Sequence, residues 1–355
     1  MTDAQTQRAA DGEAPVRHIF RWDLDKTYLR TEFDTVRDLI RTALQAPEEK
    51  VNVPGAVALL RELTRDHDGG RALVTFVSRS PSQMRKTLER KFEIDGIRPD
   101  AFILKPTLRN ILKGRFRAVR GQVGYKLDAL LRLRMRAPSA PETLFGDDAE
   151  QDAFIYSLYA DLAAGRVGRE DLVAILDEAQ VYESTAEAIL ARFEDLRVED
   201  NVDRIFIHLD RHTAPGRFWV FGPRLVPITN YFQAAVVLYA DGVMGPRGLV
   251  RVADEMIEGN GYGIMELANS LQDLARRRHV DMAVFDRLAE QWKGVDDHDA
   301  LPPDFLERLI GRVKALAPRV QHVSREWEGP VDYLEVLRAD RKMRERVQPD
   351  SGLFS

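Results

Sequence analysis

The run ALVTFVS at residues 72–78 constrains the fold most, because it is continuously apolar and rich in β-branched residues. A strand has this composition when both of its faces are buried, as in a parallel sheet covered by helices. Similar strand patterns occur at residues 17–22 (RHIFRW), 101–105 (AFILK), 143–148 (TLFGDD) and 204–210 (RIFIHLD). Helix-like stretches separate them, so we predict an α/β fold with a parallel sheet of about five strands flanked by helices.

The chain has 355 residues, which fits two domains or one α/β domain with large additions. We expect a disordered lead-in over residues 1–16 and an α/β domain over 17–213, with a helical insertion near 161–200. A helix-like pattern also covers residues 34 to about 44. From residue 227 to residue 345 the sequence is almost entirely helix-like, and residues 214–345 are predicted to form a helical accessory domain, followed by a flexible tail at 346–355.

Composition excludes several classes of protein. The net charge of −5 argues against general binding of nucleic acid. The absence of cysteine excludes disulfides, thiolate zinc sites and cysteine nucleophiles, and it fits a reducing cytoplasm. The N-terminal residues do not resemble a secretory signal, and the apolar stretch AAVVLYA at 234–240 is too short to span a bilayer.

Two acids follow the first predicted strand directly, in the sequence DLDKT at residues 23–27. Asp23 and Asp25 can turn into one crevice at the carboxyl end of the sheet, where open α/β sheets bind their ligands. One carboxylate can then attack or bind a metal ion while the other transfers protons. A solvated turn explains the pentapeptide alone equally well. A calcium loop is excluded because Tyr28 occupies the position that requires glycine.

Two further polar residues fit the same crevice. Ser78 ends the second strand, where a hydroxyl can bind a phosphate oxygen, although turn chemistry before Pro81 explains it as well. Lys126 stands where a helix is predicted to begin, near residue 124. A cation is disfavoured there by the helix dipole, so a bound anion would account for it, whereas an ordinary solvated lysine is the simpler explanation.

The acidic segment GDDAEQD at residues 146–152 ends the fourth predicted strand. Its carboxylates belong to Asp147, Asp148, Glu150 and Asp152, and they repel one another unless a cation is present. Oxygen ligands of this kind suit Mg²⁺. The alternative is a solvated acidic loop.

Taken together, these four features resemble the haloacid-dehalogenase-like (HAD) phosphatase superfamily, in which strands end in D-x-D-x-T, in Ser/Thr and in an acidic G-D motif. The runs VSRSP and GDDAEQDAFIY are similar to the catalytic domain of the actin-patch-type phosphatidate phosphatases. The resemblance covers about residues 17–160 and the strand at 204–210. The chain departs from that family at Lys26, where an acid is usual, and at Asp148, where a small residue is usual.

The resemblance implies a HAD-like Rossmannoid sheet and a Mg²⁺-dependent phosphomonoester hydrolase. Asp23 would be the nucleophile that forms an aspartyl phosphate, and Asp25 the acid and base. Ser78 and Lys126 would hold the phosphoryl oxygens, and Thr27 would brace the loop at the substrate. The metal would be held by Asp23, the Leu24 carbonyl and Asp147, with Asp148 and Asp152 as further candidates.

The sequence leaves the substrate open. Seven basic residues and no acid occur between Lys105 and Lys126 (Lys105, Arg109, Lys113, Arg115, Arg117, Arg120 and Lys126), as in a surface that receives an anionic substrate or an anionic membrane. A solvated helix accounts for this basic strip too. Phosphatidate or another lipid phosphate is the first expectation. The alternatives are a nucleic-acid end phosphatase and a non-enzymatic scaffold whose C-terminal helices bind a partner protein. The oligomeric state is open.

Overall fold

The structure is a computed structural model that describes residues 14–31, 46–65, 70–105, 120–281, 283–292, 305–316 and 329–347. Most of the predicted lead-in, the helix predicted over residues 34–44 and the tail beyond residue 347 lie outside the described residues.

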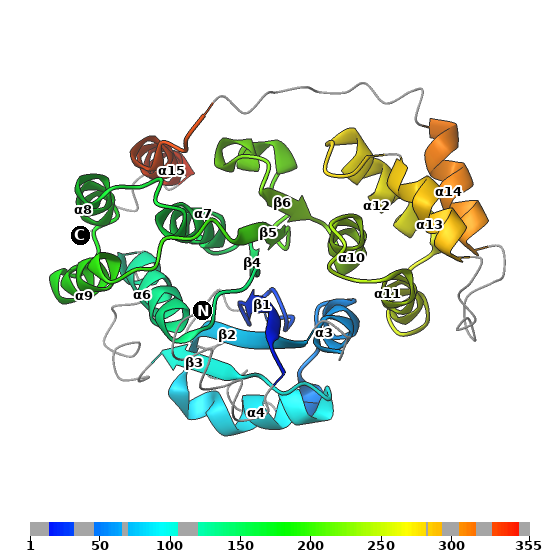
Figure 1. The fold of residues 1–355 in the computed structure, drawn as a ribbon, viewed down its shortest axis with the longest axis horizontal. Coiled ribbons are helices and arrows are strands. Elements are labelled where there is room, and N and C mark those ends of the chain that lie inside the picture. Colours follow the sequence, from blue (N-terminus) through cyan, green and yellow to red (C-terminus); the bar gives the residue numbers. More distant parts are fainter. Residues whose placement is uncertain are drawn as a thin grey trace, which may run out of the picture.

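Parallel strands form one sheet in the order β3-β2-β1-β4-β5-β6 (Figure 1). They are β1 (Val16–Trp22), β2 (Arg71–Pro81), β3 (Ala101–Lys105), β4 (Glu142–Asp147), β5 (Val202–His208) and β6 (Leu225–Ile228). The α/β class and the parallel sheet are therefore confirmed. The strand order reverses between β1 and β4, and ligands of such sheets bind in the crevice outside the carboxyl ends of the strands at that point.

Strand β6 adds a sixth member to the five strands that the sequence predicted. It lies within the stretch expected to be helical, and it pairs with β5 through Ile207 and Pro227. Four residues are too few to show a strand period, and a proline argues against an interior strand. Proline is tolerated here because β6 is at the edge of the sheet, where its missing N–H breaks no ladder.

Helices cover both faces of the sheet (Figure 1). On one face α3 (Ala56–Thr64), α4 (Arg85–Ile94) and α10 (Tyr231–Ala240) share a core with the strands, and α6 (Arg120–Arg136) and α7 (Asp152–Ala163) cover the other. The remaining described helices are α8 (Arg169–Glu178), α9 (Glu183–Glu194), α11 (Pro246–Glu258), α12 (Ile264–Arg276), α13 (Ala283–Trp292), α14 (Phe305–Leu316) and α15 (Tyr333–Val347). None of the helices in the described part of the chain has the length and apolarity to cross a bilayer. The division into two domains at residue 213 stays a prediction.

A row of aromatic side chains crosses the sheet close to the strand ends that carry Asp23 and Asp147. Strand register aligns Phe102, Phe76, Trp22, Phe145 and Phe206 on neighbouring strands. The Trp22 and Phe145 rings stack with centroids 3.9 Å apart, and both side chains are fully buried. Aromatic pairs of this kind add about 1 kcal/mol beyond their buried area. This packing fixes the positions from which Asp23 and Asp147 project.

Buried His18 on β1 makes the stability of the fold depend on pH. Its Nε2 lies 2.9 Å from Thr143 Oγ1, and burial, then Arg17, lowers the pKa of His18 to about 4. The folded state therefore holds the neutral imidazole. Stability is complete above the unfolded pKa of about 6.5, and roughly 3 kcal/mol of it is lost as pH falls towards 4.

The substitution His18→Gln keeps a polar partner for Thr143 but cannot titrate. We expect it to lose less stability between pH 7 and pH 4 than the wild type does, measured by urea unfolding at both pH values. An equal loss in the two proteins would show that His18 does not carry this dependence.

Candidate active site

Asp23 stands one residue beyond β1, where its amide donates a hydrogen bond of 2.8 Å to the carbonyl of Phe145 on β4. This bond extends the β1–β4 pairing and anchors the aspartate at the switch point of the sheet. The side chain is buried, and its Oδ1 lies 2.7 Å from Lys126 Nζ. Its Oδ2 is also buried and has no hydrogen-bond partner among the described residues.

Asp147 ends β4 beside Asp23. Its Oδ1 accepts hydrogen bonds from the amides of Ala149 and Glu150, at 2.6 and 3.0 Å, so the carboxylate closes the turn that follows the strand. Its Oδ2 is buried without a partner in the described part of the chain. Gly146 permits this turn, since a Cβ at that position would lie 2.6 Å from the Asp152 side chain.

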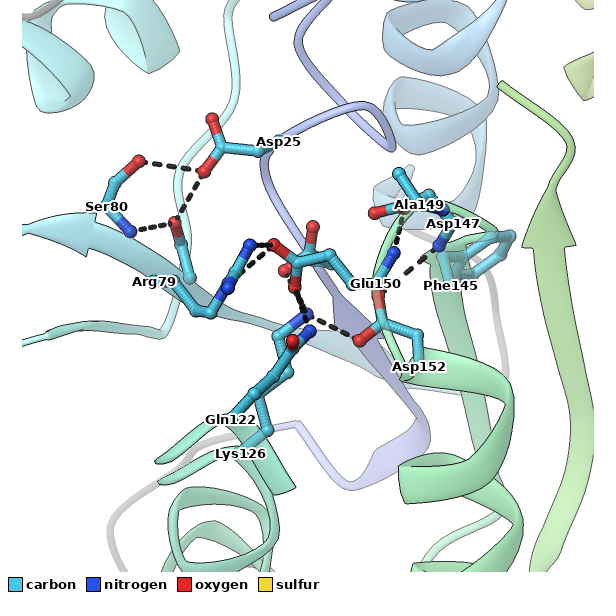
Figure 2. Close-up of polar contacts among 12 residues, drawn as sticks. Asp25, Arg79, Ser80, Gln122, Lys126, Phe145, Asp147, Ala149, Glu150 and Asp152 are labelled. Atoms are coloured by element: carbon cyan, nitrogen blue, oxygen red, sulfur yellow. Dashed lines mark hydrogen bonds and ion pairs between the residues drawn. The ribbon is translucent and has the colours of Figure 1, made fainter. Parts of the chain in front are cut away.

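Lys126 is the buried counter-ion of the site (Figure 2). Its Nζ contacts Asp23 at 2.7 Å, Glu150 at 2.6 Å and Asp152 at 2.5 Å. Burial lowers the pKa of Lys126, but the three carboxylates outweigh it and raise that pKa well above the usual value. The lysine is therefore held in its charged form.

Lys126 was predicted to stand at the start of a helix. This prediction is wrong. Helix α6 begins at Arg120, so Lys126 lies in its second turn and faces inward. The glycines at 121 and 124 weaken the helical pattern at its true start, because glycine is a poor helix former. The helix dipole therefore does not explain the position of this lysine, whereas the surrounding carboxylates do.

Glu150 was counted in the acidic segment but not among the predicted catalytic or metal-binding residues, and it joins the cluster. One of its oxygens accepts from Arg79 Nε at 2.6 Å, and the other contacts Lys126 and accepts from Gln122 Nε2 at 2.9 Å. Both oxygens are thus engaged by cationic or polar groups. Its place in GDDAEQD is the one sequence signal that pointed to it.

The described residues form a group that can hold a metal ion. Ligand atoms of Asp23, Asp147, Glu150 and Asp152 all lie within 4.8 Å of one another. The oxygens that lack partners belong to Asp23 and Asp147, so a divalent cation fits between these two. Burial raises the pKa of both carboxyls well above the usual value, and neighbouring carboxylates add to the shift. A cation with hard oxygen ligands would relieve this repulsion.

Two predicted metal ligands are engaged elsewhere. The Leu24 carbonyl accepts hydrogen bonds from the amides of Tyr28 and Leu29, at 2.9 and 2.8 Å, so its lone pairs already close the loop. Asp148 turns away and accepts from the amides of Arg211 and Thr213. Neither belongs to the group of clustered acids, because local backbone geometry uses their oxygens first.

Asp25 lies beside the cluster and is bound by two serines. Ser78 Oγ donates to Asp25 Oδ2 at 3.1 Å, and Ser80 Oγ donates to the same oxygen at 2.8 Å. Burial raises the pKa of Asp25, whereas both serine hydroxyls lower it. Ser80 was not predicted as a site residue, because the strand was expected to end at Ser78 and a hydroxyl beyond that end resembles an ordinary turn residue, whereas β2 continues to Pro81. Ser80 nevertheless positions the predicted acid and base.

The loop that carries these acids is braced from the C-terminal part of the chain. Tyr231 of α10 donates from its hydroxyl to the Thr27 carbonyl at 2.7 Å. His208 Nδ1 lies 2.9 Å from the Lys26 carbonyl, and Lys26, which has a positive φ of 60°, pairs with Asp210 at 3.2 Å. Thr27 is fully buried; its carbonyl accepts from Tyr231, and its Oγ1 has no hydrogen-bond partner among the described residues.

The basic strip does not form one exposed surface. Lys126 belongs to the buried cluster, and Lys105 is half-buried at the end of β3. Residues 106–119, with Arg109, Lys113, Arg115 and Arg117, lie outside the described residues, as does the side chain of Arg120. Lys126 therefore does not belong to an exposed basic surface. The expectation that the rest of the basic strip receives an anionic substrate or membrane stays a prediction.

Comparison with known proteins identifies part of the chain. Residues 22–173 match the model of one family, described as phosphatidate phosphatase APP1, catalytic domain. The resemblance inferred from the motifs is confirmed for this segment, which covers less than half of the chain and is similar to a phosphatase family. The match includes Asp23, Asp25, Ser78, Lys126 and the acidic segment at 146–152, and it ends before β5. The search of curated proteins and the search of solved structures each found no match.

Proposed function

We propose, from the phosphatidate phosphatase family of residues 22–173, that this chain hydrolyses a lipid phosphomonoester through an aspartyl phosphate on Asp23. Phosphatidate is the first substrate to test. The observation that supports this most is the arrangement of Asp23 and Asp147, whose open buried oxygens face a site already supplied with Lys126. The lack of cysteine supports a reducing compartment, and we propose the cytoplasm.

The chain's own residues suit the proposed steps. Asp23 attacks phosphorus, forming an aspartate–phosphate bond while the bond to the leaving oxygen breaks. Asp25 gives its proton to that oxygen, then takes a proton from the water that cleaves the aspartyl phosphate. Ser78 and Lys126 hold phosphoryl oxygens. A Mg²⁺ ion held by Asp23 and Asp147 would supply positive charge that offsets the repulsion between carboxylate and phosphate.

The purified full chain should release inorganic phosphate from phosphatidate in detergent micelles when Mg²⁺ is present. A chelator should abolish the release, and excess Mg²⁺ should restore it, because one buried oxygen each of Asp23 and Asp147 has no hydrogen-bond partner among the described residues and is open to a metal ion. Phosphate release is the readout, and a 5′-phosphorylated oligonucleotide serves as the comparison substrate. Preferred cleavage of the oligonucleotide would replace the lipid assignment, and release that the chelator leaves unchanged would contradict the metal.

A further inference from the structure

Two cations lie side by side at the mouth of the acidic cluster, at the ends of β2 and β3. Arg79 directly follows Ser78 on β2. Lys105 ends β3 and is paired in register with Pro81, two residues after Arg79. Figure 2 shows Arg79 reaching towards Glu150 from the same side as Ser80. The sequence counted Lys105 only as a member of the basic strip and gave Arg79 no role, and neither side chain is needed to hold the metal.

Both cations have N–H groups that make no hydrogen bond with the described residues. Arg79 uses Nε and Nη2 on Glu150, and its third nitrogen, Nη1, makes no hydrogen bond with the described residues. The Arg79 side chain is 42% exposed, so this nitrogen can meet a ligand. Lys105 is half-buried and forms no hydrogen bond or ion pair within the described part of the chain. A half-buried ammonium without a partner is costly unless an anion binds it.

The two charges also oppose each other. Burial lowers the pKa of Lys105, Arg79 lowers it further, and Glu150 acts in the opposite direction. Arg79 is in turn influenced by Asp23 and Asp25, which sets it close to the reaction centre. Like charges placed together beside a phosphate site are relieved when an anion arrives.

The charge balance of the site favours such groups. With Asp25 protonated as the acid, four carboxylates carry charge, those of Asp23, Asp147, Glu150 and Asp152. Lys126, Arg79 and one divalent cation balance these four charges. Lys105 then adds one positive charge, so a dianionic phosphate meets a positive site, whereas without Lys105 it would meet a neutral one.

We propose that Arg79 and Lys105 form a cationic rim that binds the outer oxygens of the substrate's phosphoryl group and selects dianionic monoesters over monoanionic diesters. The proposal rests on the proposed function and names the charge state that this site accepts. Arg79 and Lys105 are substrate-binding residues in it, in addition to Lys126, which is fully buried and contacts three carboxylates.

The test compares Lys105→Met with Lys86→Met, which removes an exposed lysine from α4. Methionine keeps the aliphatic stem of lysine, so both variants are expected to fold. Charge-assisted hydrogen bonds contribute about 2 kcal/mol, so KM for 4-nitrophenyl phosphate should rise about 10- to 100-fold in Lys105→Met, with little change in kcat. Lys86→Met should keep the wild-type KM. Arg79→Gln should raise KM likewise, and Arg79→Lys should recover part of the loss.

Discrimination between esters separates a rim from a general loss of binding. The preference of kcat/KM for 4-nitrophenyl phosphate over bis(4-nitrophenyl) phosphate should fall in Lys105→Met and stay constant in Lys86→Met. An unchanged preference, or a rise in KM confined to lipid vesicles, would contradict the proposal that the cationic rim distinguishes dianionic from monoanionic esters.

A binding measurement keeps the test independent of catalysis. Titration calorimetry with inorganic phosphate and Mg²⁺ should show an affinity at least about tenfold weaker in Lys105→Met than in Lys86→Met. Equal affinities would overturn the rim. If the wild type hydrolyses no phosphate ester but Lys105→Met still weakens phosphate binding, the proposed function fails and the rim stands.

Discussion

Asp23→Asn is expected to lower phosphate release by about 10⁴-fold or more, because the amide cannot form the aspartyl phosphate. The same change removes a buried charge: burial, and then the neighbouring carboxylates, raise the pKa of Asp23, and Lys126 opposes the shift. Asparagine keeps the shape of the side chain. The variant should therefore be at least as stable as the wild type in the absence of divalent cations, which is the usual trade between activity and stability at active sites.

Phosphate release and thermal unfolding of the same preparations check both halves of this expectation. Asp171→Asn, which changes an exposed acid on α8, is the matched control and should leave activity unchanged. Substantial activity in Asp23→Asn would assign the nucleophile to another residue. A marked fall in stability would mean that the attraction between Asp23 and Lys126 stabilises the fold more than the repulsion between Asp23 and the neighbouring carboxylates destabilises it.

The sheet was predictable because the centre of β2 is buried on both faces and therefore apolar over residues 72–78, and the other strands contain shorter runs of apolar residues. That pattern located β1 to β5 within one to three residues at each end. It also placed Asp23, Ser78 and Asp147 near the ends of strands, and parallel strands bring such ends to one edge. The sequence could thus name the residues that meet there, since topology rather than detailed packing joins them.

The contacts among those residues were less predictable. Asp147 and Asp148 are neighbours of the same type, and only the turn that follows β4 decides which one faces the cluster. The Leu24 carbonyl is likewise engaged by local backbone geometry, because it accepts hydrogen bonds from amides of its own loop. Ser80 acquires its role from Asp25, 55 residues away, and Glu150 and Arg79 acquire theirs from each other, 71 residues apart. No local pattern records such pairings.

The contact between α10 and the loop that carries Asp23 and Asp25 could not be predicted from the motifs either. Tyr231 lies 204 residues from Thr27 in sequence, outside the segment that matches the phosphatase family. The ring of Tyr231 stacks on Trp22, directly before Asp23, with centroids 5.5 Å apart. The helical region that follows the last strands therefore supports the geometry of the reaction centre, in addition to any role as an accessory domain.

The second large effect is expected for Lys126→Met, which keeps the volume of the side chain but leaves three buried carboxylates without their counter-ion. Removing one partner of a buried ion pair costs about 3–5 kcal/mol. Activity should fall by about 10³-fold, since Lys126 is also a donor to the phosphoryl oxygens. Lysine is required rather than any apolar filler of similar size, because Asp23, Glu150 and Asp152 must stay ionised while buried.

The pH dependence of the variant separates charge from packing. Burial raises the pKa of Asp23 and of Asp152, and Lys126 opposes both shifts. Without the lysine these folded-state pKa values lie further above their unfolded values, so the folded state binds more protons and the variant gains stability as pH falls. Urea unfolding at pH 7 and pH 5 should show the gap between variant and wild type narrowing at pH 5. A gap that is constant with pH would mean that lost packing, not unpaired charge, causes the destabilisation.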